Sequence, residues 1–261
     1  MKLVALQLAL FAGAAAAHDL YLMPETFRVS GQQVATVGIH NGDAFPESQQ
    51  TPPMERLRDA MAHTTKGAVR LQGPRADGKR AVLNVPVTGP GHVLVTVVAA
   101  ANVFSMKPDE FLEYLNEEAL THVIDWRKSH DESGKDARER YTKFAKTILL
   151  AGDGNGGYAK PAGLPIEFIP ESDPFQMKPG GSLNVKVLFK GAPAAGLMVA
   201  AASTKDPKAH PIGRTSADGR IAIPIDAAGK WRLHTVLMEP LADRSVADWE
   251  SFWATLTFEI P

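Results

Sequence analysis

The sequence predicts a mainly β fold of two β-sandwich domains, the first with a helical insertion and the second immunoglobulin-like or prealbumin-like. Hydrophobic residues make up 44% of the chain and charged residues 22%, which is typical of a folded globular protein. Short apolar runs alternate with turn residues in both halves, as strands do. Between these halves, apolar residues recur every three or four positions, which indicates helix.

The amino-terminal domain is predicted to span residues 18–163 and to begin as β structure. Apolar runs separated by turn signals predict its strands at 19–22, 33–39, 81–87 and 92–98. The segment Thr88-Gly89-Pro90-Gly91 separates the last two runs and predicts a turn between them.

A helical segment is expected at 108–150 within this domain. Its first helix would place one apolar stripe on a single face, and acidic residues near its start suit the helix dipole. The stripe consists of Leu112, Leu115, Ala119, Val123 and Trp126. A second helix is predicted from similar spacing in Tyr141, Phe144, Ala145, Ile148 and Leu149.

The carboxyl-terminal domain is predicted to span residues 164–261. A glycine-rich connector at 152–157 precedes it and lacks the Gly-Lys-Ser/Thr ending of a phosphate-binding loop. Six apolar runs then follow at intervals of about ten residues, the spacing of a β-sandwich. They lie at 166–169, 183–189, 197–202, 219–225, 231–237 and 253–260.

Residues 1–17 are predicted to be a secretory signal peptide. Lys2 precedes a short apolar run, and four alanines at 14–17 provide an Ala-x-Ala cleavage site. The run is too short to cross about 30 Å of hydrocarbon, so we expect no membrane span after cleavage. Cleavage after Ala17 would make His18 the first residue of an exported, periplasmic protein and would expose an α-amino group beside its imidazole.

Composition narrows the function classes. The formal net charge is −1 and the basic residues are dispersed, so a nucleic-acid partner is not expected. The chain has no cysteine, which removes thiolate metal sites and cysteine nucleophiles. The sequence contains no Gly-x-Ser-x-Gly elbow, kinase set or dinucleotide fingerprint, so an enzyme is the less favoured class.

Four residues are candidate metal ligands. The amino and ring nitrogens of His18 would suit a divalent transition metal such as nickel, cobalt or copper. His234 on a predicted strand and His40 at a strand end are the candidate second imidazoles, and Asp248 is a candidate oxygen ligand. Each of these three has an alternative structural role, as a hydrogen-bonding histidine in a sheet or as a turn or cap residue.

Several segments resemble one family of exported bacterial proteins of uncharacterised function. They are His18 to Pro24, Tyr141 to Lys146, Leu164 to Pro170 with Asp173-Pro174, Gly191 to Gly196, and Asp248 to Phe258. The family is often labelled a nickel-uptake substrate-specific component, and some members are encoded near cobalt or nickel transporters. The resemblance covers nearly the whole mature chain and implies a metal-binding role. The second half also resembles prealbumin-like modules of surface and periplasmic proteins.

These observations favour an exported accessory protein that binds nickel, cobalt or copper and passes it to a membrane metal transporter. The alternative is a non-catalytic adhesion or carbohydrate-binding protein that uses Trp231, Trp249 and Trp253 as a binding face. A sandwich core normally takes up such indoles, so exposure of two or more would favour this alternative. A copper oxygenase is the third possibility.

Overall fold

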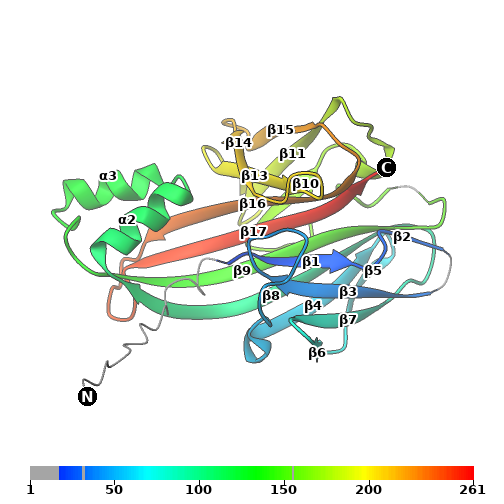
Figure 1. Ribbon diagram of the computed structural model, residues 1–261, viewed down its shortest axis with the longest axis horizontal. Helices are drawn as coiled ribbons and strands as arrows, with labels where there is room; N and C mark the ends of the chain where they lie inside the picture. Colours follow the sequence, from blue (N-terminus) through cyan, green and yellow to red (C-terminus); the bar gives the residue numbers. More distant parts are fainter. Residues whose placement is uncertain (1–17, 31–32, 155) are drawn as a thin grey trace, which may run out of the picture.

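The computed structural model describes residues 18–30, 33–154 and 156–261, and their strands form three sheets (Figure 1). The predicted leader, residues 1–17, lies outside the described residues. The central sheet has nine strands in the order β14-β13-β16-β17-β9-β8-β4-β5, with β2 also pairing with β9. The strands of this sheet are β2 Arg28–Val29, β4 Leu57–Thr64, β5 Gly67–Arg70, β8 Gly91–Met106, β9 Ala137–Ala151, β13 Met198–Ser203, β14 His210–Arg214, β16 Gly229–Pro240 and β17 Trp249–Ile260.

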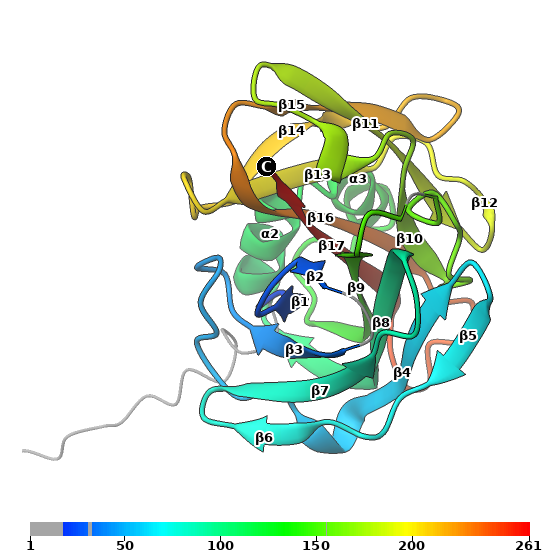
Figure 2. The ribbon, with the colours of Figure 1, turned by 90° about the vertical axis from the view of Figure 1, so that its right-hand side faces the viewer.

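Two four-stranded sheets pack against the central sheet (Figure 2). The β1 sheet has the order β1-β3-β7-β6 and contains β1 Leu20–Pro24, β3 Val34–Asn41, β6 Arg75–Asp77 and β7 Arg80–Pro86. The β11 sheet contains β10 Ile166–Pro170, β11 Gly181–Phe189, β12 Ala192–Pro193 and β15 Arg220–Ile225. The prediction of a mainly β, sandwich-like fold is therefore confirmed.

The predicted second helix is wrong, because residues Ala137–Ala151 form strand β9. Phe144 and Ile148 on one face of β9 join the core with the β11 sheet, whereas Ala145 and Leu149 on the other face join the core with the β1 sheet. A strand that is buried on both faces carries apolar residues at odd and even positions, so its sequence can mimic a helical spacing.

The first predicted helix is present as two shorter helices, α2 Pro108–Glu117 and α3 Thr121–Ser129. Ala119 has a φ of 53°, a left-handed conformation that no helix interior adopts, and it separates them. The two helices cover one end of the long central strands (Figure 1), where Phe111 and Leu115 join a core with Trp249. No described helix is both long and apolar enough to cross a bilayer.

The central sheet joins the segments 18–163 and 164–261. Residues Glu139–Thr147 of β9 pair in parallel with Trp249–Thr257 of β17, so backbone hydrogen bonds connect residues on either side of the predicted boundary. The first strand also takes part, because Thr255 and Thr257 of β17 donate their hydroxyls to carbonyls of β1. Two further short 3-10 helices, η1 Met54–Arg56 and η2 Pro174–Gln176, lie in connections.

Candidate functional site

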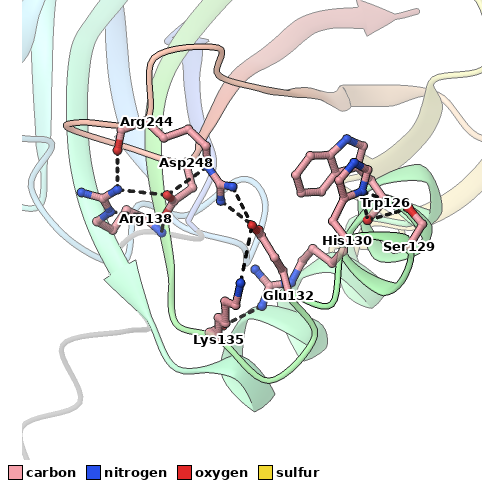
Figure 3. A network of polar contacts seen from close by, with 9 residues as sticks. Trp126, Ser129, His130, Glu132, Lys135, Arg138, Arg244 and Asp248 are labelled. Carbon is pink, nitrogen blue, oxygen red and sulfur yellow. Dashed lines mark hydrogen bonds and ion pairs between the residues drawn. The ribbon is translucent and has the colours of Figure 1, made fainter.

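Asp248 lies in an arginine network near the helices (Figure 3). Its Oδ1 is 3.0 Å from Arg138 Nη2, and its Oδ2 accepts a hydrogen bond of 2.9 Å from the Arg138 backbone N–H. Arg244 Nε lies 3.3 Å from Oδ1 of the same carboxylate. Although burial by itself raises the pKa of Asp248, the Arg138 contacts hold it below its usual range. Asp248 therefore fixes the loop before β17 to the start of β9.

His234 is buried between two carboxylates. Its Nδ1 is 2.6 Å from Asp19 Oδ1 and its Nε2 is 2.8 Å from Glu118 Oε2. Burial by itself lowers the pKa of His234, but the charges of Asp19 and Glu118 outweigh it and raise the pKa to about 10. The ring is thus an imidazolium at neutral pH, and in this arrangement neither nitrogen offers a lone pair to a metal.

Asp19 is the centre of this buried charge cluster. Its Oδ2 lies 3.1 Å from Arg232 Nη2, while its Oδ1 faces His234. Burial raises the pKa of Asp19, but Arg232 and His234 together hold it well below its usual range. Asp19 therefore connects the first described strand to β16 by charge as well as by packing.

His40 lies in a separate environment on β3. It pairs across the strands with Tyr21, and the two ring centroids are 5.3 Å apart. Its Nδ1 is 3.1 Å from the Pro46 carbonyl oxygen, while its Nε2 is buried without a hydrogen-bond partner. Burial lowers the pKa of His40 to about 4, so its ring is neutral at physiological pH. In this position His40 contributes to packing against Tyr21.

His18 lies at the beginning of the described chain with both ring nitrogens facing polar groups. Gln50 Nε2 is 2.7 Å from Nδ1, and Asp43 Oδ2 is 3.4 Å from Nε2. The His18 side chain is 19% exposed, so its ring is held against the surface rather than extended into solvent. Lys143 Nζ also donates a hydrogen bond to the His18 carbonyl oxygen.

The four predicted ligands are not assembled into one side-chain cluster. Across residues 18–30, 33–154 and 156–261, no group of three or more His, Asp or Glu side chains is arranged to hold a metal ion. His18 faces Gln50 and Asp43, His234 faces two carboxylates, His40 packs against Tyr21, and Asp248 binds arginines. Only His18 keeps a ring nitrogen near the surface with a neutral hydrogen-bond partner.

A cavity of about 260 Å³ opens beside His18. Two residues that contact His18 line this cavity. Gln50 contacts the His18 ring, and Lys143 donates a hydrogen bond to the His18 carbonyl oxygen. Arg56 at the end of η1 and Tyr141 on β9 complete its polar side, and Arg56 Nη1 donates a hydrogen bond of 2.6 Å to the Tyr141 hydroxyl. Two cationic side chains, those of Arg56 and Lys143, therefore line the cavity.

Two of the cavity residues, Tyr141 and Lys143, also belong to a buried polar row on β9, whose third member is Glu139. These residues alternate along the strand and so lie on one face. Burial lowers the pKa of Lys143 to about 8. Burial also raises the pKa of Glu139 to about 7, against the opposing effect of its bonds from Ser251 and Tyr114. The helix predicted for this segment placed Tyr141 on an apolar stripe, whereas in β9 it lies between Glu139 and Lys143 on one face.

The three tryptophans proposed as a binding face are all buried. Trp231, Trp249 and Trp253 are exposed by 5%, 1% and 3% respectively. Trp249 and Trp253 pack in the core beneath the helices, and Trp231 belongs to the core with the β11 sheet. These indoles therefore do not form an exposed surface for a glycan or a protein.

Sequence reasoning missed the cavity residues Arg56, Tyr141 and Lys143. A signal was present in the alternation of Glu139, Tyr141 and Lys143, which places three polar groups on one face of a strand. It was hidden because the same stretch was interpreted as a helix. Arg56 carries no sequence signal, since only the fold brings η1 next to β9.

Comparison with known proteins gives a family and only remote structural similarity. No curated protein matches the chain. The D0-D1 domain of intimin shares 10% identity, covers 91% of this chain and 96% of its own, and gives a TM-score of 0.21. A mutant of Salmonella alpha-2-macroglobulin shares 12% identity over 97% of this chain and 16% of its own, with a TM-score of 0.27. The Yersinia pseudotuberculosis adhesin InvE shares 13% identity over 93% of this chain and 59% of its own, with a TM-score of 0.20. A family model matches residues 15–239, and the chain belongs to the family described as "Domain of unknown function (DUF4198)".

Proposed function

We propose that this chain is an exported accessory protein that binds nickel, cobalt or copper through His18 and serves metal uptake or handling. The proposed metal is cargo, held by the ring Nδ1 and by the α-amino nitrogen that cleavage after Ala17 would expose. Two nitrogen donors on one residue suit Cu(II) and Ni(II), which favour nitrogen ligands and planar arrangements.

The observation that carries this proposal is the pair of groups on the His18 ring. Asp43 lies 3.4 Å from Nε2 and favours a proton there, while the Gln50 amide lies 2.7 Å from Nδ1 and is placed to donate to its lone pair. Both contacts favour the tautomer with the lone pair on Nδ1, and a bound metal would take the place of the Gln50 amide at that lone pair. Carboxylates commonly orient metal-binding histidines in this way, through the nitrogen that does not bind the metal.

The main chain around His18 is also held in place. Its carbonyl oxygen accepts a hydrogen bond from Lys143, and the next backbone N–H, that of Asp19, lies 3.4 Å from Asp43 Oδ1. A fixed first residue reduces the conformational entropy lost when a metal binds. The metal sphere would be completed by water, since Asp43 faces the other ring nitrogen and His234 and His40 are engaged elsewhere.

The proposed setting is the periplasm, with a membrane metal transporter as the receiving partner. The leader sequence supports export, and the resemblance to proteins labelled as nickel-uptake components supports a role beside a transporter. A surface-held amino terminus would allow a metal to be passed on without unfolding of the chain.

The test compares three forms of the protein by calorimetric titration with Cu(II), Ni(II) and Co(II). The first begins at His18, the second carries one extra glycine before His18, and the third is His18→Ala. The added glycine moves the α-amino group away from the imidazole and keeps every side chain. We expect the first form to bind at least one metal with 1:1 stoichiometry, and both altered forms to bind at least tenfold more weakly.

His210→Ala serves as the matched control, because His210 is an exposed histidine that pairs with Asp206 on the surface. It should leave the titration unchanged. Equal binding by the His18-initiated and glycine-extended proteins would refute the amino-terminal chelate, and so would the absence of binding for all three metals.

A further inference from the structure

We propose that the cavity beside His18 is a binding site for a small organic carboxylate. This site is separate in chemistry from the proposed metal chelate and does not depend on it. It rests on an unpaired cationic N–H group, two further donors in the same lining, and three apolar residues that also line the cavity.

Arg56 provides the unpaired donor. Its Nε donates to the Ala100 carbonyl oxygen at 2.8 Å and its Nη1 donates to the Tyr141 hydroxyl at 2.6 Å, whereas its Nη2 is buried without a hydrogen-bond partner. Burying an unsatisfied charged donor is costly, so such a group in a cavity points to a ligand that would accept from it. The two satisfied nitrogens hold the guanidinium rigidly in this orientation.

Two more donors line the same cavity, Tyr141 and Lys143, of which Lys143 also donates to the His18 carbonyl oxygen. The Tyr141 hydroxyl accepts from Arg56, with the Asn102 amide 3.4 Å away, so its own proton is available to donate. Lys143 lies over the rings of Tyr141 and Trp253, with its Nζ 5.2 and 4.6 Å from their centroids, and it lines the cavity. An anion placed here would receive charge-assisted hydrogen bonds, which are the strong kind.

The apolar part of the lining favours an organic ligand. Leu20, Pro53 and Ala99 line the cavity, and none of its described lining residues is acidic. A volume of about 260 Å³ is near the lower end of ligand pockets and exceeds the share of several waters, at about 30 Å³ each. A carboxylate with a short carbon chain would contact both the cationic and the apolar lining residues, whereas inorganic phosphate would leave the apolar ones uncovered.

The test is calorimetric titration of metal-free protein, residues 18–261, with acetate, succinate and inorganic phosphate at constant ionic strength. We expect at least one carboxylate to bind more tightly than phosphate. Arg56→Met should weaken that binding roughly tenfold or more, because it removes a charged donor. Arg56→Lys keeps the charge but not the Nη2 geometry, and it should also weaken binding.

Arg70→Met is the matched control, since Arg70 is an exposed arginine paired with Asp59 on a nearby strand. It should leave carboxylate binding unchanged. Circular dichroism melts establish that each variant is folded, and Tyr141→Phe, which removes only the hydroxyl, provides a milder change in the same cavity. The proposal is overturned if wild type binds neither carboxylate, if phosphate binds more tightly, or if folded Arg56 variants bind as wild type does.

Discussion

Replacing Lys146 with methionine should destabilise the protein strongly, because it breaks a fully buried ion pair. Lys146 Nζ lies 2.9 Å from Glu167 Oε2, and the two side chains are exposed by only 1% and 2%. The Glu167 carboxylate also accepts hydrogen bonds from the backbone N–H groups of Ala162 and Gly163. Lys146→Met would leave this carboxylate charged and buried without its cation.

The expected cost is about 3–5 kcal/mol, the usual penalty for removing one partner of a buried pair. For a chain of this size it corresponds to a fall in melting temperature of roughly 6–20 °C. Lys205→Met is the matched control. Lys205 and Asp226 are also 2.9 Å apart, but their side chains are 61% and 63% exposed. An exposed pair contributes at most about 1 kcal/mol, so this variant should differ little from wild type.

The assay is urea unfolding of residues 18–261 followed by tryptophan fluorescence, with circular dichroism as a second probe. A further variant, Lys146→Met with Glu167→Leu, removes both charges and should recover much of the loss, since no buried charge remains unpaired. The reasoning is refuted if Lys146→Met costs no more free energy of unfolding than Lys205→Met does.

Three further predictions concern buried charges and one turn. The native pKa of His234 is about 10 against 6.5 for the free group, so the folded state binds more protons and stability should fall between about pH 6.5 and pH 10. Urea midpoints measured across this window should lose that slope in His234→Gln, and an unchanged slope would contradict the assignment. The native pKa of Glu139 is about 7, against 4.5 for the free group, so the folded state binds more protons between these values. Stability should therefore also fall between about pH 4.5 and pH 7, by on the order of 3 kcal/mol. Glu139→Gln should flatten this region of the curve of stability against pH. Gly219→Ala should lower the stability measured in thermal melts by about 1–3 kcal/mol more than Gly191→Ala does. Both glycines have a positive φ, but only at Gly219 would the new Cβ lie 2.7 Å from a backbone oxygen, that of Val187. Equal costs would show that the left-handed φ, rather than the clash, dominates.

The strands of this protein that are bordered by turn residues were predictable from sequence. The runs at 33–39 and 81–87 correspond to β3 and β7, and the first helical stripe corresponds to α2 and α3. Local periodicity and turn chemistry are properties of adjacent residues, so they are visible without the fold. The same local signal failed at residues 144–151 of β9, because both faces of that part are buried and carry apolar residues, so neither face reveals the period of a strand.

The candidate site was only partly predictable. The sequence by itself singled out His18, from the predicted leader before it, and predicted that a second imidazole from elsewhere in the chain would join it. Tertiary structure alone decided the rest. It placed carboxylates on both sides of His234, bound Asp248 to arginines, and brought Arg56 of η1 beside Lys143 of β9. These contacts join residues far apart in the chain, and side-chain charge and burial depend on such neighbours, which no local pattern specifies.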